Sequence, residues 1–516
     1  MPKPFDFGGV NLTAGDDASG ARPSAETPFC IAILGDFSGR ASRGVCDAKL
    51  IGKRRALPID RDNFDEVLSR SGAEIQLAMG EGGALHLRFS ELDDFHPDGI
   101  FQRLDIFAKL REMRGRLQDP STFQKVAGEL GLRLGDSVAD ARKSDTAPAT
   151  APGATTLVSG RLLDAMVEQT EARVATERSG RSGDDVGEFA RRVVAQHLVN
   201  SPDPRQPEVL AVVDRAIGGL MRAVLHSPDF QGLEAAWRAA FLLVRQLETG
   251  SQLKLFLIDI SKQELAADLN SVGCAEDLRN TGACRLLVEQ SVETPGAEPW
   301  SIILGNYRFG PGSEDRELLS QMARIADRAG AAFLAGASPA LLGCASLVTA
   351  PRPRDWTTPE KSGGWAALRR LPEAGAVGLA LPRFMLRLPY GKETSPLESF
   401  EFEEFVDGAV HEDYLWGNPA FAVALLLAQS FSEGGREMRP GQIAEISKLP
   451  LHVYERDGES QVKPCAEVVL SEDAVERLVE EGLIPLVSFK GRDVARVARV
   501  QSIAEPLRPL AGRWSR

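Results

Sequence analysis

The sequence is poor in the residues that catalytic, metal-binding and disulfide-rich proteins depend on. It has six cysteines and six histidines in 516 residues. No two cysteines form a CxxC pair, which argues against a zinc site and predicts free thiols in a reducing cytoplasm. HExxH, GxSxG and Walker A sequences are absent as well. We therefore predict no catalytic residues, no metal and no cofactor, and interpret the protein as a non-enzyme.

Long apolar runs and an excess of basic residues are also missing. No segment approaches the roughly 20 apolar residues that span a bilayer, and the start of the chain, Met1–Asn11, has no apolar core of a secretory signal. Lys and Arg number 60 against 73 Asp and Glu, giving a formal net charge of −13. Nucleic-acid binding usually requires a basic face. We expect a cytoplasmic protein that neither inserts into a membrane nor binds nucleic acid.

Composition divides the chain into four parts. Residues 1–27 are rich in Gly, Ala, Asp and Ser, which predicts a flexible arm. Residues 136–205 begin with an Ala/Thr/Pro-rich stretch and continue with helical patterns, which indicates a linker and helical connector. Residues 28–135 and 206–516 are the two candidate globular parts on either side of this connector.

Apolar periodicity and turn residues predict alternating helices and strands. This alternation indicates an α/β fold class with mixed α+β layers. The expected helices are 63–69, 100–117, 161–176, 186–199, 209–225, 230–247, 315–329, 419–431 and 471–481; the expected strands are 29–34, 74–78, 85–89, 253–260, 301–305, 331–335, 377–381, 451–454, 466–470, 484–489 and 494–500.

Three polar groups have both a structural and a functional interpretation. Gly35–Arg40 (GDFSGR) is either a structural turn or a phosphate loop, and the first is favoured. His411, followed by two acids, is either part of a packing cluster ahead of helix 419–431 or an acid–base or metal site. The acids Asp93, Asp94 and Asp98 either begin helix 100–117 as caps and dipole partners or bind a cation.

Two blocks of motifs resemble the two subunits of the type VI secretion contractile sheath. The block Ile31–Leu117 contains ILGDFSGR, LPIDRDNFDEVL and LRFSELDDFHPDGI, and it resembles the small subunit (TssB/VipA/ImpB family). The block Val209–Pro506 contains LHSPDFQGLEAAWR, LALPRFMLRLPYGKETSPLESFEFEE and YLWGNPAF, and it resembles the large subunit (TssC/VipB/ImpC family). The chain thus looks like a fusion of both subunits. One departure is NYRF at Asn306–Phe309, where the family tends to have a DYEF-like run.

The resemblance implies a contractile-sheath fold and a structural role. A sheath protomer of this kind polymerises into a helical tube around an inner tube and contracts to drive effector injection. The alternative is an accessory, cap or scaffold protein of the same apparatus that does not itself contract. Implied partners are further copies of the chain, an Hcp-like inner tube protein, baseplate components and a ClpV-type AAA+ unfoldase. Residues from about 160 to 205 replace or shorten the large subunit's usual N-terminal segment, which such an unfoldase reads.

Two sets of contact residues follow from the resemblance. Strand exchange between protomers is expected at the first strand or in the residues before it, and contact with the inner tube at the acidic helix 471–481. For the acidic helix, the alternative is a solvated face without a partner. The strand-exchange residues are Phe29, Cys30, Ile31, Ala32, Ile33 and Leu34, and the tube-contact residues are Glu472, Asp473, Glu476, Glu480 and Glu481.

Overall fold

The computed structural model describes residues 27–79, 83–119, 126, 206–271, 275–357, 363–406, 408, 410–456 and 458–514. Residues 1–26 of the arm predicted at 1–27, the linker and the helices predicted at 161–176 and 186–199 lie outside these residues. The strands are β1 (Phe29–Gly35), β2 (Leu57–Ile59), β3 (Ala73–Met79), β4 (Gly83–Phe89), β5 (Leu253–Asp259), β6 (Trp300–Phe309), β7 (Ala332–Ala337), β8 (Val377–Leu381), β9 (Phe384–Met385), β10 (Trp416–Gly417), β11 (Glu445–Ile446), β12 (His452–Arg456), β13 (Glu459–Lys463), β14 (Ile484–Ser488) and β15 (Ala495–Val497).

Helices alternate with these strands along most of the chain. The longer ones are α1 (Phe64–Ser71), α2 (Pro97–Arg103), α3 (Asp105–Gln118), α7 (Gln206–Leu225), α8 (Pro228–Gln246), α9 (Lys262–Leu269), α11 (Ser313–Ala329), α12 (Gly364–Arg369), α13 (Ala420–Gly434) and α14 (Glu472–Glu480). Shorter turns are η1 (Ala48–Lys53), η2 (Leu92–Phe95), η4 (Ala275–Asn280), α10 (Gly282–Cys284), η6 (Pro339–Leu342), η7 (Pro353–Asp355), η8 (Pro372–Ala376), η9 (His411–Asp413) and η10 (Gly435–Glu437), and η5 (Arg285–Glu293) is a π-helix of nine residues.

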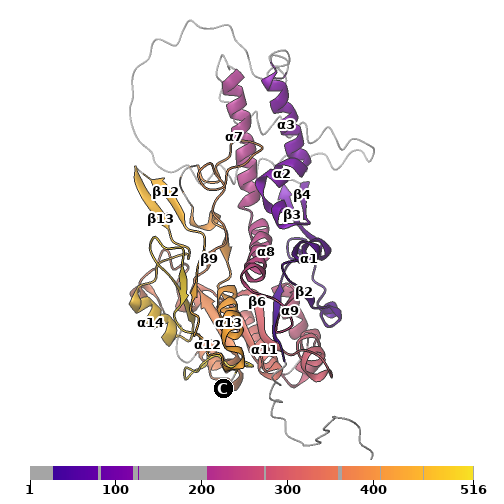
Figure 1. Cartoon of the computed structure of the whole chain (residues 1–516), viewed down its shortest axis with the longest axis vertical. Coiled ribbons are helices and arrows are strands. Elements are labelled where there is room, and N and C mark those ends of the chain that lie inside the picture. Colours follow the sequence, from indigo (N-terminus) through magenta and orange to yellow (C-terminus); the bar gives the residue numbers. More distant parts are fainter. Residues whose placement is uncertain are drawn as a thin grey trace, which may run out of the picture.

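A nine-stranded mixed sheet forms the centre of the molecule, with helices against both faces (Figure 1). Its strand order is β11-β15-β14-β8-β7-β6-β1-β5-β2. The six strands from β14 to β5 are parallel, whereas β2 at one edge and β15 and β11 at the other run antiparallel to their neighbours. Parallel strands need both faces covered, which agrees with the near-continuous apolar sequence of β1, β5 and β7. The predicted α/β fold class is confirmed.

The central strand β1 comes from the N-terminal part of the chain. It lies between β5 and β6, which both come from the C-terminal part, and pairs in parallel with each. Its side chains alternate between two cores. Phe29, Ile31 and Ile33 face the core that includes α8 and α13, and the residues between them face the core that includes α9 and α11. Residues 28–135 and 206–516 therefore share one sheet and both of its cores.

This position corrects the expectation of strand exchange at Phe29–Leu34. An exchanged strand needs a free edge to offer to a neighbour, and both edges of β1 are hydrogen-bonded within this chain. Every residue of β1 is buried. The structure thus places these six residues in the chain's own sheet, and removing residues 1–35 would delete its central strand.

Two predicted elements, a helix and a strand, are interrupted or reduced in the structure. The helix expected over 100–117 is divided at Leu104, whose backbone is extended (φ −79°, ψ 129°), while apolar residues on both sides still pack into one core. The spacing of apolar residues cannot reveal this one-residue break, because the apolar residues of α2 and α3 still face the same side. The strand expected over 466–470 is reduced to a single bridge between Ala466 and Phe384, because the backbone there bonds to the segment after β8.

Helices α3 and α7 stand side by side at one end of the molecule, beyond the sheet (Figure 1). The Arg114 guanidinium donates to both carboxylate oxygens of Asp214, at 2.6 and 3.2 Å. The Gln206 amide donates to the carbonyl oxygens of Leu117 and Gln118 at the end of α3. These contacts join the N-terminal and C-terminal parts a second time, away from β1. None of the helices in the described ranges is both long and apolar enough to cross a membrane.

The shared sheet predicts the behaviour of a nicked chain. A specific protease site inserted near Pro152, inside the predicted linker, should allow cleavage into two fragments. We expect both fragments to co-elute from a sizing column at the position of the uncut chain, because separating them would expose β5, β6 and two cores. They should part only in denaturant. Separate elution in native buffer would contradict the shared sheet.

Candidate functional site

The turn after β1 is built by its own polar residues. The Asp36 carboxylate accepts the backbone N–H groups of Arg40 and Ala41, at 2.7 and 2.8 Å. Gly39 has φ +70°, and a Cβ there would lie 2.0 Å from the carbonyl oxygen of Glu74, so only glycine fits. This turn carries Arg40 back toward β5. The favoured interpretation of GDFSGR as a structural turn is confirmed.

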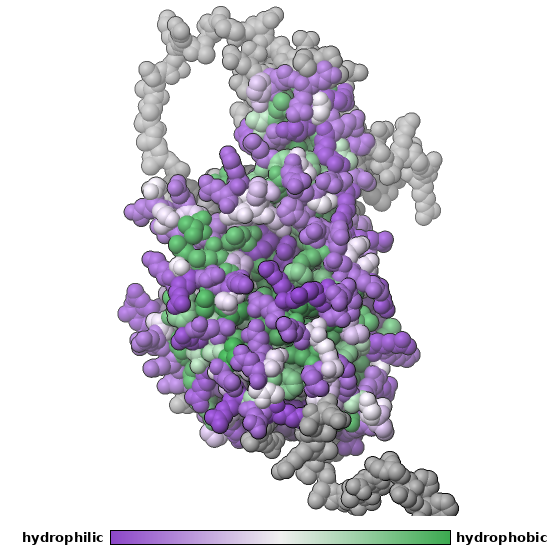
Figure 2. Space-filling view, viewed as in Figure 1, coloured by the Kyte–Doolittle hydropathy of each residue, from purple (hydrophilic) through white to green (hydrophobic). Residues whose placement is uncertain are grey.

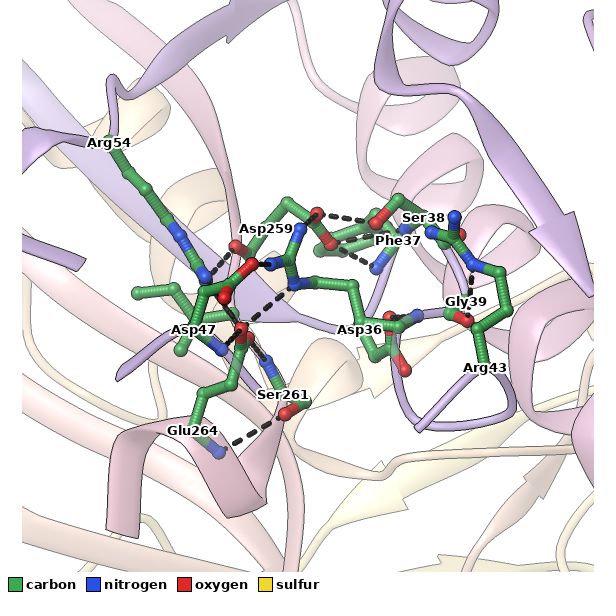
Figure 3. A network of polar contacts seen from close by, with 12 residues as sticks. Asp36, Phe37, Ser38, Gly39, Arg43, Asp47, Arg54, Asp259, Ser261 and Glu264 are labelled. Carbon is green, nitrogen blue, oxygen red and sulfur yellow. Dashed lines mark hydrogen bonds and ion pairs between the residues drawn. The ribbon is translucent and has the colours of Figure 1, made fainter. Parts of the chain in front are cut away.

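Two carboxylates, one at the last residue of β5 and one in α9, hold this turn in place (Figure 3). Asp259 accepts the backbone N–H groups of Phe37 and Ser38, at 2.8 and 3.1 Å, and the Ser38 hydroxyl at 2.6 Å. Glu264, at the start of α9, accepts Arg40 Nε at 2.9 Å and Arg54 Nη2 at 2.7 Å. We call Arg40, Arg54, Asp259 and Glu264 the joint, because they link the N-terminal part to the C-terminal part next to β1.

Glu264 is the centre of the joint. Its side chain is fully buried, and it also accepts the backbone N–H groups of Asp47 and Ser261. Burial alone would raise the pKa of Glu264, but the hydrogen bonds from Arg54, Asp47 and Ser261 outweigh burial and lower its pKa to about 2. The Glu264 carboxylate is therefore charged at neutral pH, and it is the shared counter-charge of the Arg40 and Arg54 guanidinium groups.

A second buried network links motifs of the C-terminal part. Arg387 is bonded to the carboxylates of Glu234 and Glu404, with the shortest distances 2.9 and 2.8 Å. Arg238 Nε also donates to Glu234, at 2.7 Å, and Arg238 Nη2 donates to the Tyr390 hydroxyl. Burial raises the pKa of an isolated glutamate, but Arg387 and His226 lower the pKa of Glu404 to about 2. The motifs LHSPDFQGLEAAWR and LALPRFMLRLPYGKETSPLESFEFEE meet in this network.

His411 belongs to a third polar cluster. Its Nδ1 accepts from Lys463 Nζ at 2.8 Å, and its Nε2 lies 3.3 Å from Glu467. Arg383 binds Glu467 as well, at 2.7 Å. Burial opposes the charge on Glu467, yet His411 and Arg383 lower its pKa to about 2. Both imidazole nitrogens are thus occupied by neighbouring side chains, which agrees with the interpretation as a packing cluster; within the described part of the chain, no group of three or more potential ligands could hold a metal ion.

The acids expected to begin helix 100–117 do so in part. Asp98 lies in the first turn of α2, and its carboxylate accepts the backbone N–H groups of Glu398 and Ser399 at 3.0 Å each. Asp94 caps the preceding turn η2, where it accepts the N–H groups of Ser90 and Glu91. Asp98 therefore also joins the N-terminal part to the C-terminal part.

The acidic helix forms as predicted. The Ser471 hydroxyl accepts the backbone N–H of Ala474, so Ser471 is the N-cap of α14. Glu472, Asp473, Glu476 and Glu480 are exposed, and hydrophilic side chains cover the molecule where α14 lies (Figures 1 and 2). Arg477 pairs with both Glu480, at 3.2 Å, and Glu481, at 2.9 Å. Glu481 differs from the four exposed acids, because it is half-buried and its carboxylate also lies 3.5 Å from Arg369.

Comparisons with known proteins match both the N-terminal and the C-terminal part of the chain. The family model for VipB, described as "EvpB/VC_A0108, tail sheath N-terminal domain", matches residues 207–504. A second model, described as "Type VI secretion system, VipA, VC_A0107 or Hcp2", matches residues 9–143. The chain belongs to the type VI secretion sheath protein family. It carries the large-subunit (VipB/TssC) and small-subunit (VipA/TssB) parts together, and its role is that of a structural sheath protein.

Two curated relatives show the same division. The type VI secretion system sheath protein TssC1 of Pseudomonas aeruginosa is 34% identical over 337 residues, which is 62% of this chain and 67% of that protein. The sheath protein TssB1 of the same organism is 28% identical over 110 residues, which is 20% of this chain and 62% of that protein. In this family member, the small-subunit part supplies β1 and the large-subunit part supplies its neighbours.

Sequence reasoning did not identify the joint. The capping box of Ser261 and Glu264 is visible as an SxxE pattern, and the basic residues of the loop after β1 stand out in the sequence. Nothing in the sequence pairs the two, because Arg40 and Glu264 are 224 residues apart. Only the parallel register of β1 and β5 brings them to the same end of the sheet.

Removing the buried carboxylate of the joint should lower the free energy of unfolding. We expect Glu264→Ala to destabilise the chain by about 3–5 kcal/mol, because Arg40 and Arg54 would lose their shared partner. Glu66→Ala on α1 is the control. Glu66 forms an exposed i,i+4 pair with Arg70, and its loss should cost no more than about 0.5 kcal/mol. Urea unfolding measures both, and equal midpoints for the two variants would contradict the role of the joint.

The depressed carboxyl pKa values predict acid sensitivity. Glu264, Glu404 and Glu467 each have a pKa lowered from 4.5 to about 2 in the folded chain. The unfolded state therefore binds protons more readily, and the stability that these groups contribute is present above about pH 4.5 and lost as the pH falls toward 2. The urea midpoint should drop between pH 5 and pH 2.5. Glu404→Gln should lower the urea midpoint at pH 7 and weaken its dependence on pH. A wild-type midpoint that stays constant down to pH 2.5 would contradict the role of these three carboxylates.

Proposed function

We propose that this chain is the complete protomer of a contractile sheath, with both subunits in one polypeptide. The observation that carries the proposal is β1, a strand of the small-subunit part that lies at the centre of the large-subunit sheet. Covalent linkage fixes the two parts in a ratio of one to one. On this proposal, residues 28–135 and 206–516 correspond to the two subunits, and 136–205 connect them.

The proposed protomer acts by repeated self-association. Head-to-tail contacts between different patches on successive copies generate an open helix when they do not close into a ring. Contraction is then a rigid-body rearrangement between two packings of the same protomers, triggered at the baseplate. The rigid unit that moves is the shared sheet with its two cores. We propose that the protein works in the cytoplasm, without catalysis and without a cofactor, and that the stroke drives effector injection.

We assign the inner-tube contact to α14. Four exposed acids on this helix, Glu472, Asp473, Glu476 and Glu480, face away from its buried residues Ala474 and Leu478. A tube protein of the Hcp kind would need a complementary basic ring, since opposite potentials fix register and steer assembly. Exposed pairs contribute only about 0–1 kcal/mol each, but a sheath repeats them many times. Glu481 is left out of the contact because it is half-buried and its carboxylate lies near the buried Arg369.

The remaining partners are proposed from the family resemblance. Baseplate components would hold one end of the sheath, and a ClpV-type unfoldase would disassemble it after contraction. The segment that such an unfoldase would read falls among residues 160–205, where the usual N-terminal segment is shortened or replaced, and these residues lie outside the described structure.

Charge reversal on α14 tests the function and the tube contact together. Asp473, Glu476 and Glu480 are spaced to share one side of the helix, and all three are exposed. Their triple replacement by Lys should prevent the sheath from enclosing the inner tube protein at physiological salt, while the melting temperature changes little. A matched control is the triple replacement of Asp62, Asp65 and Glu66, which are exposed on and beside α1 and give the same charge change.

Electron microscopy of the purified chain with the tube protein distinguishes the outcomes. Striated tubes from the wild type and the α1 control, but not from the α14 variant, support the proposal. Tubes from all three would make the α14 acids a solvated face. Discrete particles from the wild type would favour the accessory, cap or scaffold role instead.

A further inference from the structure

A cleft of about 570 Å³ opens at the carboxyl ends of the central strands. Asp36 after β1, Ser261 after β5, the segment Asn306–Arg308 in β6 and Gly336 in β7 all line it. The chain passes from β1 to β5 on one side and then returns to β6 on the other side of β1. In open parallel sheets this reversal of strand order marks the crevice where ligands bind. A volume of several hundred Å³ suits a small organic molecule.

A bulge in β6 places polar side chains at this cleft. Pairing between β6 and β7 is interrupted between Leu304 and Arg308, and β1 pairs with β6 only as far as Gly305. Bulges of this kind redirect side chains and are common next to binding sites. Asn306 and Arg308 lie in the irregular segment, and both line the cleft.

Arg308 is the cation of the cleft that lacks a counter-charge. Its Nε donates to the carbonyl oxygen of Ala337 at 3.4 Å, and within the described ranges no carboxylate lies within 4 Å of its guanidinium. The other two cations lining the cleft are occupied. Lys262 binds Asp315 at 2.5 Å, and Arg383 binds Glu467 and Glu412. Burial and the nearby charge of Arg383 lower the pKa of Arg308, against the opposite effect of the two glutamates. The Arg308 residue is exposed, so its guanidinium is accessible to an anion that enters the cleft.

Three helices begin at the same cleft. The first residues of α8 and α9 and the residues just before α13 line it, represented by Pro228, Lys262 and Asn418. Helix N-termini carry partial positive charge, which favours a phosphate group. Not every N–H there is free: α8 begins with Pro228, which has no N–H, and the Ala420 N–H of α13 is bonded to the Asn418 side-chain oxygen. Two carboxylates, Asp36 and Asp229, also line the cleft, but Asp36 is committed to the N–H groups of its own turn. The opposite wall is apolar and includes Leu233, Trp416 and Pro419.

We propose that this cleft binds a small organic phosphate, with the phosphate group at Arg308, Asn306 and the first turn of α9. The rest of the molecule lies against the apolar wall of Leu233 and Trp416. Arg308 supplies a planar guanidinium that can donate two parallel hydrogen bonds to phosphate oxygens. Such a ligand would occupy the crevice between α8, α13 and the sheet, and so would act on the rigid unit of the protomer without any chemical step.

Calorimetric titration of the full chain tests this site, with AMP, inorganic phosphate and adenosine as probes at constant ionic strength. We expect AMP to bind at one site per chain, phosphate to bind more weakly and adenosine not to bind. Arg308→Gln should weaken AMP binding at least about tenfold, and Asn306→Asp should weaken it as well, because it places a carboxylate beside the phosphate. Arg70→Gln, at an exposed arginine on α1, is the matched control and should leave binding unchanged.

Two results would overturn the proposal. Equal weak binding of phosphate, sulfate and chloride that Arg308→Gln does not change would mean an adventitious ion only. Failure of AMP to bind, together with loss of tubes in Arg308→Glu, would mean that an acidic segment of a second copy occupies the cleft. Because assembly is scored by microscopy and binding by calorimetry, failure of this proposal and failure of the sheath function are distinguishable. Thermal melts of the variants, expected to match the wild type, exclude unfolding as the cause.

Discussion

The insertion of β1 between β5 and β6 is the constraint on which the rest of the structure depends. A parallel strand with neighbours on both sides must find its register twice, and here the two partners lie more than 200 residues further along the chain. Hydrophobic alternation sets which face each residue of β1 occupies. The polar joint sets the end point of the strand, because Asp259 and Glu264 hold the turn that follows it. Both cores close only when this strand is in place.

Buried charge in this protein connects segments that are distant in sequence. Arg387 with Glu234 and Glu404 joins α8 to the segments after β9, and Glu264 joins the loop after β1 to α9. Such pairs add little net stability over apolar packing, since desolvation offsets much of the attraction. Their loss is nevertheless costly, because a buried charge would remain without a partner. We interpret them as specificity contacts that allow one arrangement of the two parts and penalise others.

A sheath protomer has to keep its own shape while its contacts with neighbours change. The described structure meets this need with a mixed sheet that has helices on both faces, in which β1 has no free edge. The projecting pair of α3 and α7 adds a second link between the two parts, far from the sheet. Motion during contraction is then expected at surfaces between protomers. The cleft above β6 and β7 is where a ligand could touch this rigid unit.

Local patterns in the sequence determined most of the elements and the family. The alternation and periodicity of apolar residues predicted β1, β5, β8, α11 and α13 nearly to their ends, and Ser471 and Gly482 marked the limits of α14. Tertiary structure decided the rest, because pairing of distant strands leaves no local signature. It placed Phe29–Leu34 inside a sheet rather than at an edge, broke the helix at Leu104, and withdrew Glu481 from the acidic face. Only the tertiary structure brought Arg40 to Glu264. The partner of a buried charge depends on which segments pack around it, and the neighbouring residues in the sequence do not reveal those segments.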